Sequence, residues 1–79
     1  MRLDKYLKVS RIIKRRTVAN EACDAGKVEV NGKVARASYD VKVGDVIKIT
    51  LGAKENSYKV LAITEYALKE DAAKMYEAL

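Results

Sequence analysis

The sequence predicts an α+β fold in which two N-terminal helices pack on a small antiparallel sheet and a short helix closes the chain. Three observations support this class. Apolar residues recur at helical spacing over residues 2–25, alternate with polar residues over much of residues 27–64, and return to helical spacing near the C-terminus. Because so small a sheet has no core of its own, the helices must cover one of its faces, and the chain forms one domain.

A first helix is predicted over residues 2–9. Leu3, Tyr6 and Leu7 fall on one side of it at i, i+3 and i+4 spacing, so this side should face the core. The residues expected on the opposite side are charged, namely Asp4, Lys5 and Lys8. The helix is therefore predicted to be amphipathic, with its charges in solvent.

A second helix is predicted over residues 15–25. Gly26 suits its C-terminal end, because glycine adopts a left-handed conformation without steric cost. The inner stripe of this helix is expected to consist of Val18, Ala19, Ala22 and Cys23.

Strands and turns occupy the middle of the chain. Residues 27–35 are typical of a hairpin, since Val28 and Val30 alternate with charges and Asn31-Gly32 suits a tight turn. The elements predicted next are a loop at 36–40, a turn at Gly44-Asp45, a strand at 46–51, a polar connection at 52–56 and a last strand at 57–64. A final amphipathic helix is expected over residues 69–79, with Ala72, Met75, Tyr76 and Leu79 on one face.

The charge of the chain is concentrated in its N-terminal half. The net charge is +5, but residues 1–36 carry ten Lys or Arg against four acids, whereas residues 37–79 carry six against seven. All five arginines lie in the first part: Arg2, Arg11, Arg15, Arg16 and Arg36. Arginine grips phosphate with two parallel hydrogen bonds, so a polyanionic partner is indicated, nucleic acid first and an anionic membrane second.

Catalytic and metal-binding chemistry are poorly supported. The chain has no histidine, and its one cysteine, Cys23, falls on the inner stripe of the second helix, where we interpret it as a core residue. No glycine-rich phosphate loop and no cluster of metal ligands is present in the sequence. We therefore expect a protein that is not an enzyme and needs no cofactor. The single cysteine, and a start without a signal-peptide pattern, favour the cytoplasm.

The segment "SRIIKRRT" at residues 10–17 concentrates four of the cations: Arg11, Lys14, Arg15 and Arg16. A solvated surface is the usual explanation of such a run. Here, however, no acid lies between Lys5 and Asn20, and two arginines stand where a helix begins, which is the end that favours anions. We therefore predict an anion-binding site at this helix start, with Ile12 and Ile13 anchoring the connection to the core.

Two nearby residues each have two possible roles. Asp4 could pair with Lys8 one turn further on, or could orient an arginine of the second helix. Tyr39, in the loop after Arg36, could stack on a nucleic-acid base or could pack partly on the sheet.

The chain resembles the S4 RNA-binding domain family. The resemblance lies in an opening Arg-Leu-Asp at residues 2–4, the Arg-Arg-Thr at residues 15–17, the Gly-x-Val-x-Val-Asn-Gly-Lys at residues 26–33 and the Val-x-x-Gly-Asp at residues 41–45. It implies that residues 1–64 form the S4 domain and that residues 65–79 are a short helical extension of the same domain. It also implies an RNA-binding surface in which Arg2 and Arg16 match the two arginines of the family motif.

The residues that we expect to bind RNA are Arg2, Lys5, Lys8, Arg11, Lys14, Arg15, Arg16, Thr17, Asn20 and Lys33. Asp4, Arg36 and Tyr39 are expected to orient these residues or to contribute contacts.

Within the family, the chain is most similar to short, stand-alone members that act in ribosome-associated quality control in Gram-positive bacteria. This likeness implies binding to obstructed large ribosomal subunits, contacts with 23S ribosomal RNA and peptidyl-tRNA, and cooperation with RqcH in adding alanine tails to stalled chains. It implies a monomer off the ribosome. The alternatives are the ribosome-recycling role of the related heat-shock protein and, from another class, a peripheral binder of acidic proteins or membranes, for which the first helix is too short.

Overall fold

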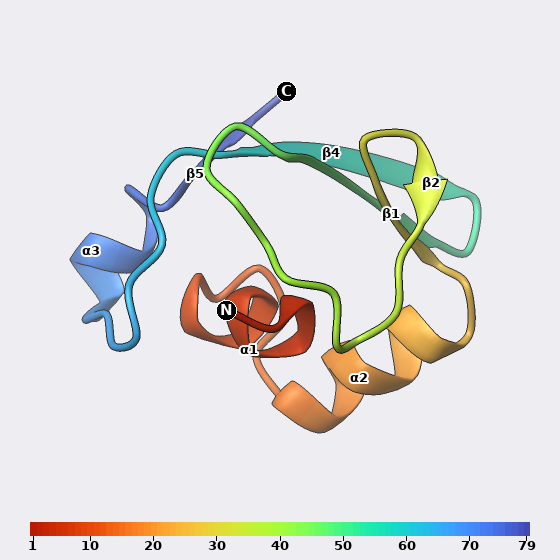
Figure 1. Ribbon diagram of the computed structural model, residues 1–79, viewed down its shortest axis with the longest axis horizontal. Coiled ribbons are helices and arrows are strands. Elements are labelled where there is room, and N and C mark those ends of the chain that lie inside the picture. The colour runs from red at the N-terminus through yellow and green to blue at the C-terminus, as the bar shows by residue number, and fades with distance from the viewer.

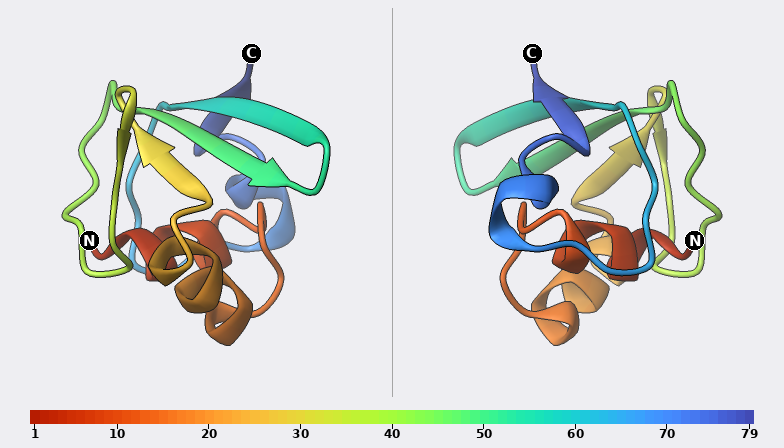
Figure 2. Two further views of the ribbon diagram at one scale, coloured as in Figure 1. Left: turned by 90° about the vertical axis from the view of Figure 1, so that its right-hand side faces the viewer. Right: turned by 90° about the vertical axis from the view of Figure 1, so that its left-hand side faces the viewer.

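The computed structural model describes residues 1–79 and consists of two layers (Figure 1). Helices α1 (Leu3–Val9) and α2 (Arg16–Asp24) form one layer and a five-stranded antiparallel sheet forms the other. A single-turn helix, α3 (Lys69–Ala72), lies to the side of this helical layer (Figure 2). The predicted class, α+β with two N-terminal helices on a small antiparallel sheet, is confirmed. None of the helices is long and apolar enough to cross a membrane.

The sheet has the strand order β2-β1-β3-β4-β5, and every neighbouring pair is antiparallel. Its strands are β1 (Val28–Val30), β2 (Lys33–Val34), β3 (Val46–Leu51), β4 (Lys54–Val60) and β5 (Tyr76–Ala78). The predicted β1–β2 hairpin is confirmed. Its turn residues Asn31 and Gly32 both have positive φ, at 53° and 84°, which is the conformation that an Asn-Gly turn supplies most easily.

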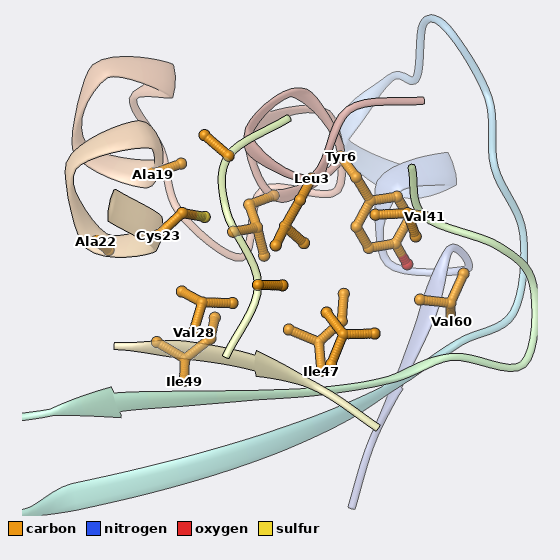
Figure 3. Packing of buried hydrophobic residues seen from close by; sticks show 14 of the residues in the cluster. Leu3, Tyr6, Ala19, Ala22, Cys23, Val28, Val41, Ile47, Ile49 and Val60 are labelled. Atoms are coloured by element: carbon orange, nitrogen blue, oxygen red, sulfur yellow. The ribbon is translucent and has the colours of Figure 1, made fainter. Parts of the chain in front are cut away.

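The core fills the space between the helices and one face of the sheet (Figure 3). In Figure 3, Val28 and Ile49 of the sheet lie toward Cys23 of α2, and Ile47 lies toward Leu3 and Tyr6 of α1. The buried apolar residues of α2 are Ala19, Ala22 and Cys23. Because two of these three are alanines, α2 can lie close to its neighbours. Two expectations are confirmed: Cys23 is a buried core residue, and Ile12 and Ile13 pack against the core from the connection between the helices.

Two details of the helical layer differ from the prediction. Val18 was expected in the inner stripe of α2 but is 47% exposed, because the helix packs through its alanines and Val18 lies about a quarter turn to one side. Asp4 was expected in solvent but is buried, with 2% of its surface exposed. Its side chain points across to α2, where Arg16 and Asn20 donate hydrogen bonds to it.

The last long strand lies earlier than predicted. Residues 52–56 were expected to form a connection and residues 57–64 a strand, but β4 begins at Lys54 and ends at Val60. Leu51 pairs with Lys54 across a turn of only Gly52 and Ala53, so the hairpin closes at once and its polar residues continue the ladder.

The C-terminal segment is helical for one turn only. The helix expected over residues 69–79 ends at Ala72, and residues 76–78 form β5, which pairs with β4. Met75 explains the change: it is buried, and its carbonyl oxygen accepts hydrogen bonds from the backbone amides of Leu61 and Ala62. A short isolated helix is only marginally stable in water. An added edge strand instead gains ladder hydrogen bonds and a T-shaped contact between Tyr58 and Tyr76.

Candidate RNA-binding site

A basic surface covers α1, the connection at residues 10–15 and the first turn of α2. Its cations are exposed, except for Lys5, which is half-buried. The members are Arg2, Lys5, Lys8, Arg11, Lys14, Arg15 and Arg16. The outer face of the sheet is different, because Lys48 there is paired with both Glu29 and Glu55. Positive charge is therefore most concentrated on the helical layer.

Asp4 is the one acid inside this surface, and it joins the two helices. Its Oδ1 accepts hydrogen bonds from Arg2 Nε at 3.2 Å and from the backbone amide of Lys5 at 2.8 Å. Its Oδ2 accepts from Arg16 Nε at 3.3 Å and from Asn20 Nδ2 at 3.2 Å. Of the two partners considered for Asp4, the structure therefore shows the arginine of the second helix and not Lys8.

The electrostatics of Asp4 follow from these contacts. Burial alone would raise the pKa of its carboxyl group, but the hydrogen bonds from Asn20, Arg2 and Arg16 outweigh burial and lower the pKa to about 2. Asp4 is thus a carboxylate at any physiological pH. It can hold both arginines with full charge.

Arg2 is held by Asp4 through Nε and Nη2, whereas Arg16 is held through Nε alone, and both keep much of their guanidinium groups accessible. Their side chains are 51% and 48% exposed. Arg16 donates a single hydrogen bond within the protein, from Nε, so both of its Nη groups are free to grip a phosphate. The pair of arginines matched to the family motif is therefore brought together around one buried carboxylate.

The two helix starts differ in whether their first backbone amides donate hydrogen bonds within the protein. At α1 the amides of Leu3 and Asp4 donate to the carbonyl oxygens of Tyr39 and Ala37, at 2.8 and 3.2 Å. At α2 the N-cap residue, Arg15, provides no side-chain cap, so the first-turn amides have no partner within the helix. An anion can therefore bind at the start of α2, where exposed Thr17 and the guanidinium of Arg16 also lie.

The connection between the helices turns its cations outward. Arg11 follows the end of α1 with a positive φ of 63°, a left-handed conformation that reverses the chain. Ser10 before it is buried and donates to the carbonyl oxygen of Leu7. With Ile12 and Ile13 against the core, the exposed positions of the connection are left to the cations.

A groove runs between this basic surface and residues 65–69. The basic wall consists of Lys5, Lys8, Arg11, Lys14 and Arg16, together with Val9, and the opposite wall consists of Glu65, Tyr66, Ala67, Leu68 and Lys69. Lys5 and Glu65 form an ion pair across it. The second wall was not predicted, because nothing in the local sequence indicates that residues sixty positions apart in the chain will meet.

Lys33, Arg36 and Tyr39 do not line the groove. They border a separate hollow beside β2 that shares no residue with it. Tyr39 packs against the core, and its hydroxyl donates to Asp45 Oδ2 at 3.1 Å. Burial, followed by this contact with Asp45, raises the pKa of Tyr39. Of its two possible roles, the structure shows packing.

Comparison with known proteins agrees with the fold. The S4 domain model matches residues 1–47. The chain is 57% identical to the "RQC P-site tRNA stabilizing factor" of Streptococcus pneumoniae and 49% identical to that of Bacillus subtilis, covering all of this chain and 90% and 92% of the relatives. The structure of Vibrio cholerae Heat Shock Protein 15 superposes with a TM-score of 0.90 at 30% identity, covering 100% of this chain and 81% of that one.

The chain is therefore a member of the S4 domain family, a class defined here by its two N-terminal helices, their arginines and the small sheet beneath them. Its full-length similarity places it more narrowly. Within that class it belongs to the family of RQC P-site tRNA stabilizing factors, also named RqcP.

Proposed function

We propose that this protein is an RNA-binding accessory factor of ribosome-associated quality control. It binds obstructed large ribosomal subunits that still carry peptidyl-tRNA, and it holds that tRNA in place. The observation that carries the proposal is the arrangement of Arg2 and Arg16 around Asp4, at a helix start whose amides are open. Such a site suits phosphates of a folded RNA, because it combines free amides, forked guanidinium groups and a surrounding basic surface.

The proposed partners are those that the resemblance to the family implies. Contacts to 23S ribosomal RNA and to the tRNA divide the basic surface between them, and RqcH supplies alanyl-tRNA, so that alanine is added to the stalled chain. In this scheme ribosomal RNA makes the peptide bond and the protein acts by binding. The chemistry of the chain supports a binding role without catalysis, since Cys23 is buried and the pKa of its thiol is raised to about 11, mainly by burial.

A second candidate is the ribosome-recycling role of the heat-shock relative. It is supported by the structural similarity to Heat Shock Protein 15 and by 35% sequence identity to the Haemophilus influenzae homolog over 82% of this chain, although this covers only 50% of that relative. The greater identity to the tRNA-stabilizing factors, over nearly their whole length, favours the first proposal.

Co-sedimentation with purified large subunits tests the proposal. Subunits carrying peptidyl-tRNA are compared with vacant subunits at one ionic strength, using the wild-type chain, Arg16→Ala and Lys59→Ala. Lys59 is an exposed cation on β4, opposite Glu77, and serves as the charge-matched control. We expect the wild-type chain to attach more strongly to the tRNA-bearing subunits than to vacant ones. Arg16→Ala should lose this attachment, whereas Lys59→Ala should keep it. Equal attachment of the wild-type chain to both kinds of subunit would contradict the tRNA-holding role.

A further inference from the structure

Tyr66 stands out among the exposed side chains. It is 79% exposed, more than any other large apolar residue of the chain, and it lies on the wall of the groove that faces the basic surface. Leu68, 59% exposed, lies on the same wall. An exposed aromatic ring beside Leu68 and opposite five cations suits a partner with both a flat apolar face and a negative charge.

The backbone that carries Tyr66 is held on both sides. Ile63 and Ala67 pack against the core on either side of it. Glu65, its neighbour, is paired with Lys5 of α1. Figure 2 shows this segment running alongside α1 before it enters α3. The backbone at Tyr66 is therefore held in place beside the cations.

The C-terminal segment is also held by contacts of Met75 on its buried side. The hydroxyl of buried Tyr6 donates to the carbonyl oxygen of Met75 at 2.7 Å, and the hydroxyl of Thr64 lies 3.6 Å from the sulfur of Met75. These contacts join α1 to the residues before and after α3. The two walls of the groove consequently belong to one packed unit.

We propose that this groove is a subsite for an unpaired nucleotide, whose base stacks on Tyr66 while its phosphates lie against Lys8, Arg11 and Lys14. A base-paired helix exposes its phosphates but keeps its base faces stacked inside, so it cannot use the ring. An unpaired nucleotide offers both a π-face and a charge. The inference rests on the proposed RNA-binding function and extends it from phosphate contacts to a position where single-stranded or flipped-out RNA is held.

Binding of short RNA strands tests the subsite. Fluorescence anisotropy compares fluorescein-labelled hexauridylate with an abasic ribose-phosphate strand of equal length, using wild type, Tyr66→Ala and Tyr66→Phe. Leu51→Ala removes an exposed apolar side chain at the far end of β3 and is the matched control. Circular dichroism checks that each variant folds, which we expect because Tyr66 is so exposed.

The expected pattern is specific to stacking. Tyr66→Ala should weaken hexauridylate binding roughly 5- to 150-fold, Tyr66→Phe should stay within about twofold of wild type, and the abasic strand should bind wild type and Tyr66→Ala alike. Unchanged hexauridylate binding in Tyr66→Ala, or equal losses on both strands, would overturn the subsite. So would a preference of the wild-type groove for an acidic peptide, which would make it a protein-docking site.

The outcomes for the subsite and for the proposed function are separable. Attachment to large subunits through Arg16 does not depend on stacking at Tyr66. If the Tyr66 experiment fails, the subsite is therefore refuted but the proposed function is not. Conversely, if Arg16→Ala still co-sediments with tRNA-bearing subunits, the proposed function fails while the hexauridylate result for Tyr66 stands.

Discussion

Replacing Asp4 by asparagine separates the positioning of the arginines from the net charge of the protein. Asp4→Asn removes a negative charge and so raises the net charge of +5 by one. If charge alone attracted RNA, the variant would bind more tightly. If Asp4 positions Arg2 and Arg16, as the four residues bonded to its carboxylate indicate, the variant should bind more weakly although it is more basic.

The effect of Asp4→Asn on stability can be worked out from the pKa. A carboxyl pKa lowered from 3.8 to about 2 corresponds to about 2–3 kcal/mol of stability at neutral pH. Because the folded-state pKa is the lower one, this contribution is complete above about pH 5 and is lost as the pH falls through about 2. The difference in unfolding free energy between wild type and Asp4→Asn should therefore be about 2–3 kcal/mol at pH 7 and should nearly vanish near pH 2.

Urea unfolding followed by circular dichroism at a series of pH values measures this difference, and co-sedimentation with large subunits at pH 7 measures binding. Asp24→Asn is the matched control, since Asp24 is an exposed acid on α2 and its replacement adds the same charge. We expect the control to retain stability and binding. A stability difference that stayed constant with pH, or an Asp4→Asn protein that folds and binds subunits more tightly than wild type, would refute the positioning role.

Three further predictions concern the same surface. If about 4–6 phosphates are neutralised, the log–log slope of RNA affinity against salt should be roughly −3 to −5, and a flat response would exclude phosphate contacts. Cys23→Ala should leave RNA binding intact and cost about 1–2 kcal/mol of stability in urea unfolding, because a small buried side chain is truncated. Arg16→Lys should recover only part of the subunit binding that Arg16→Ala loses, since an ammonium group cannot make the two-pronged contact, whereas Lys74→Ala should bind like wild type in the same co-sedimentation.

The parts of the fold that the sequence predicted correctly depend on local patterns. Both helices and the Asn31-Gly32 hairpin follow from spacing and turn chemistry within a few residues. The C-terminal strand does not, because residues 76–78 become extended only where the edge of β4 is available to them. Met75 fits either a helical face or a buried turn, and its hydrogen-bonded neighbours in the fold decide between the two.

The same distinction applies to the site. The cations and the helix start at Arg16 could be predicted, because charge and capping are properties of adjacent residues. The sequence offered Asp4 two partners of equal standing, and the choice depends on how α1 crosses α2. The pairing of Lys5 with Glu65 and the position of Tyr66 opposite the basic surface follow only from the return of the chain past α1 after β4.

The buried carboxylate of Asp4 explains in part how so small a domain tolerates its basic surface. Asp4 lies between Arg2 and Arg16 and offsets their repulsion from within, while about half of each arginine side chain stays exposed to solvent. Lys5 is paired with Glu65, but no such compensation reaches the open amides at the start of α2 or the other cations of the surface, Lys8, Arg11, Lys14 and Arg15. A bound phosphate supplies it. The arginines are already oriented before RNA arrives, so less side-chain entropy is lost on binding, and favourable contacts are gained where the free protein has repulsion.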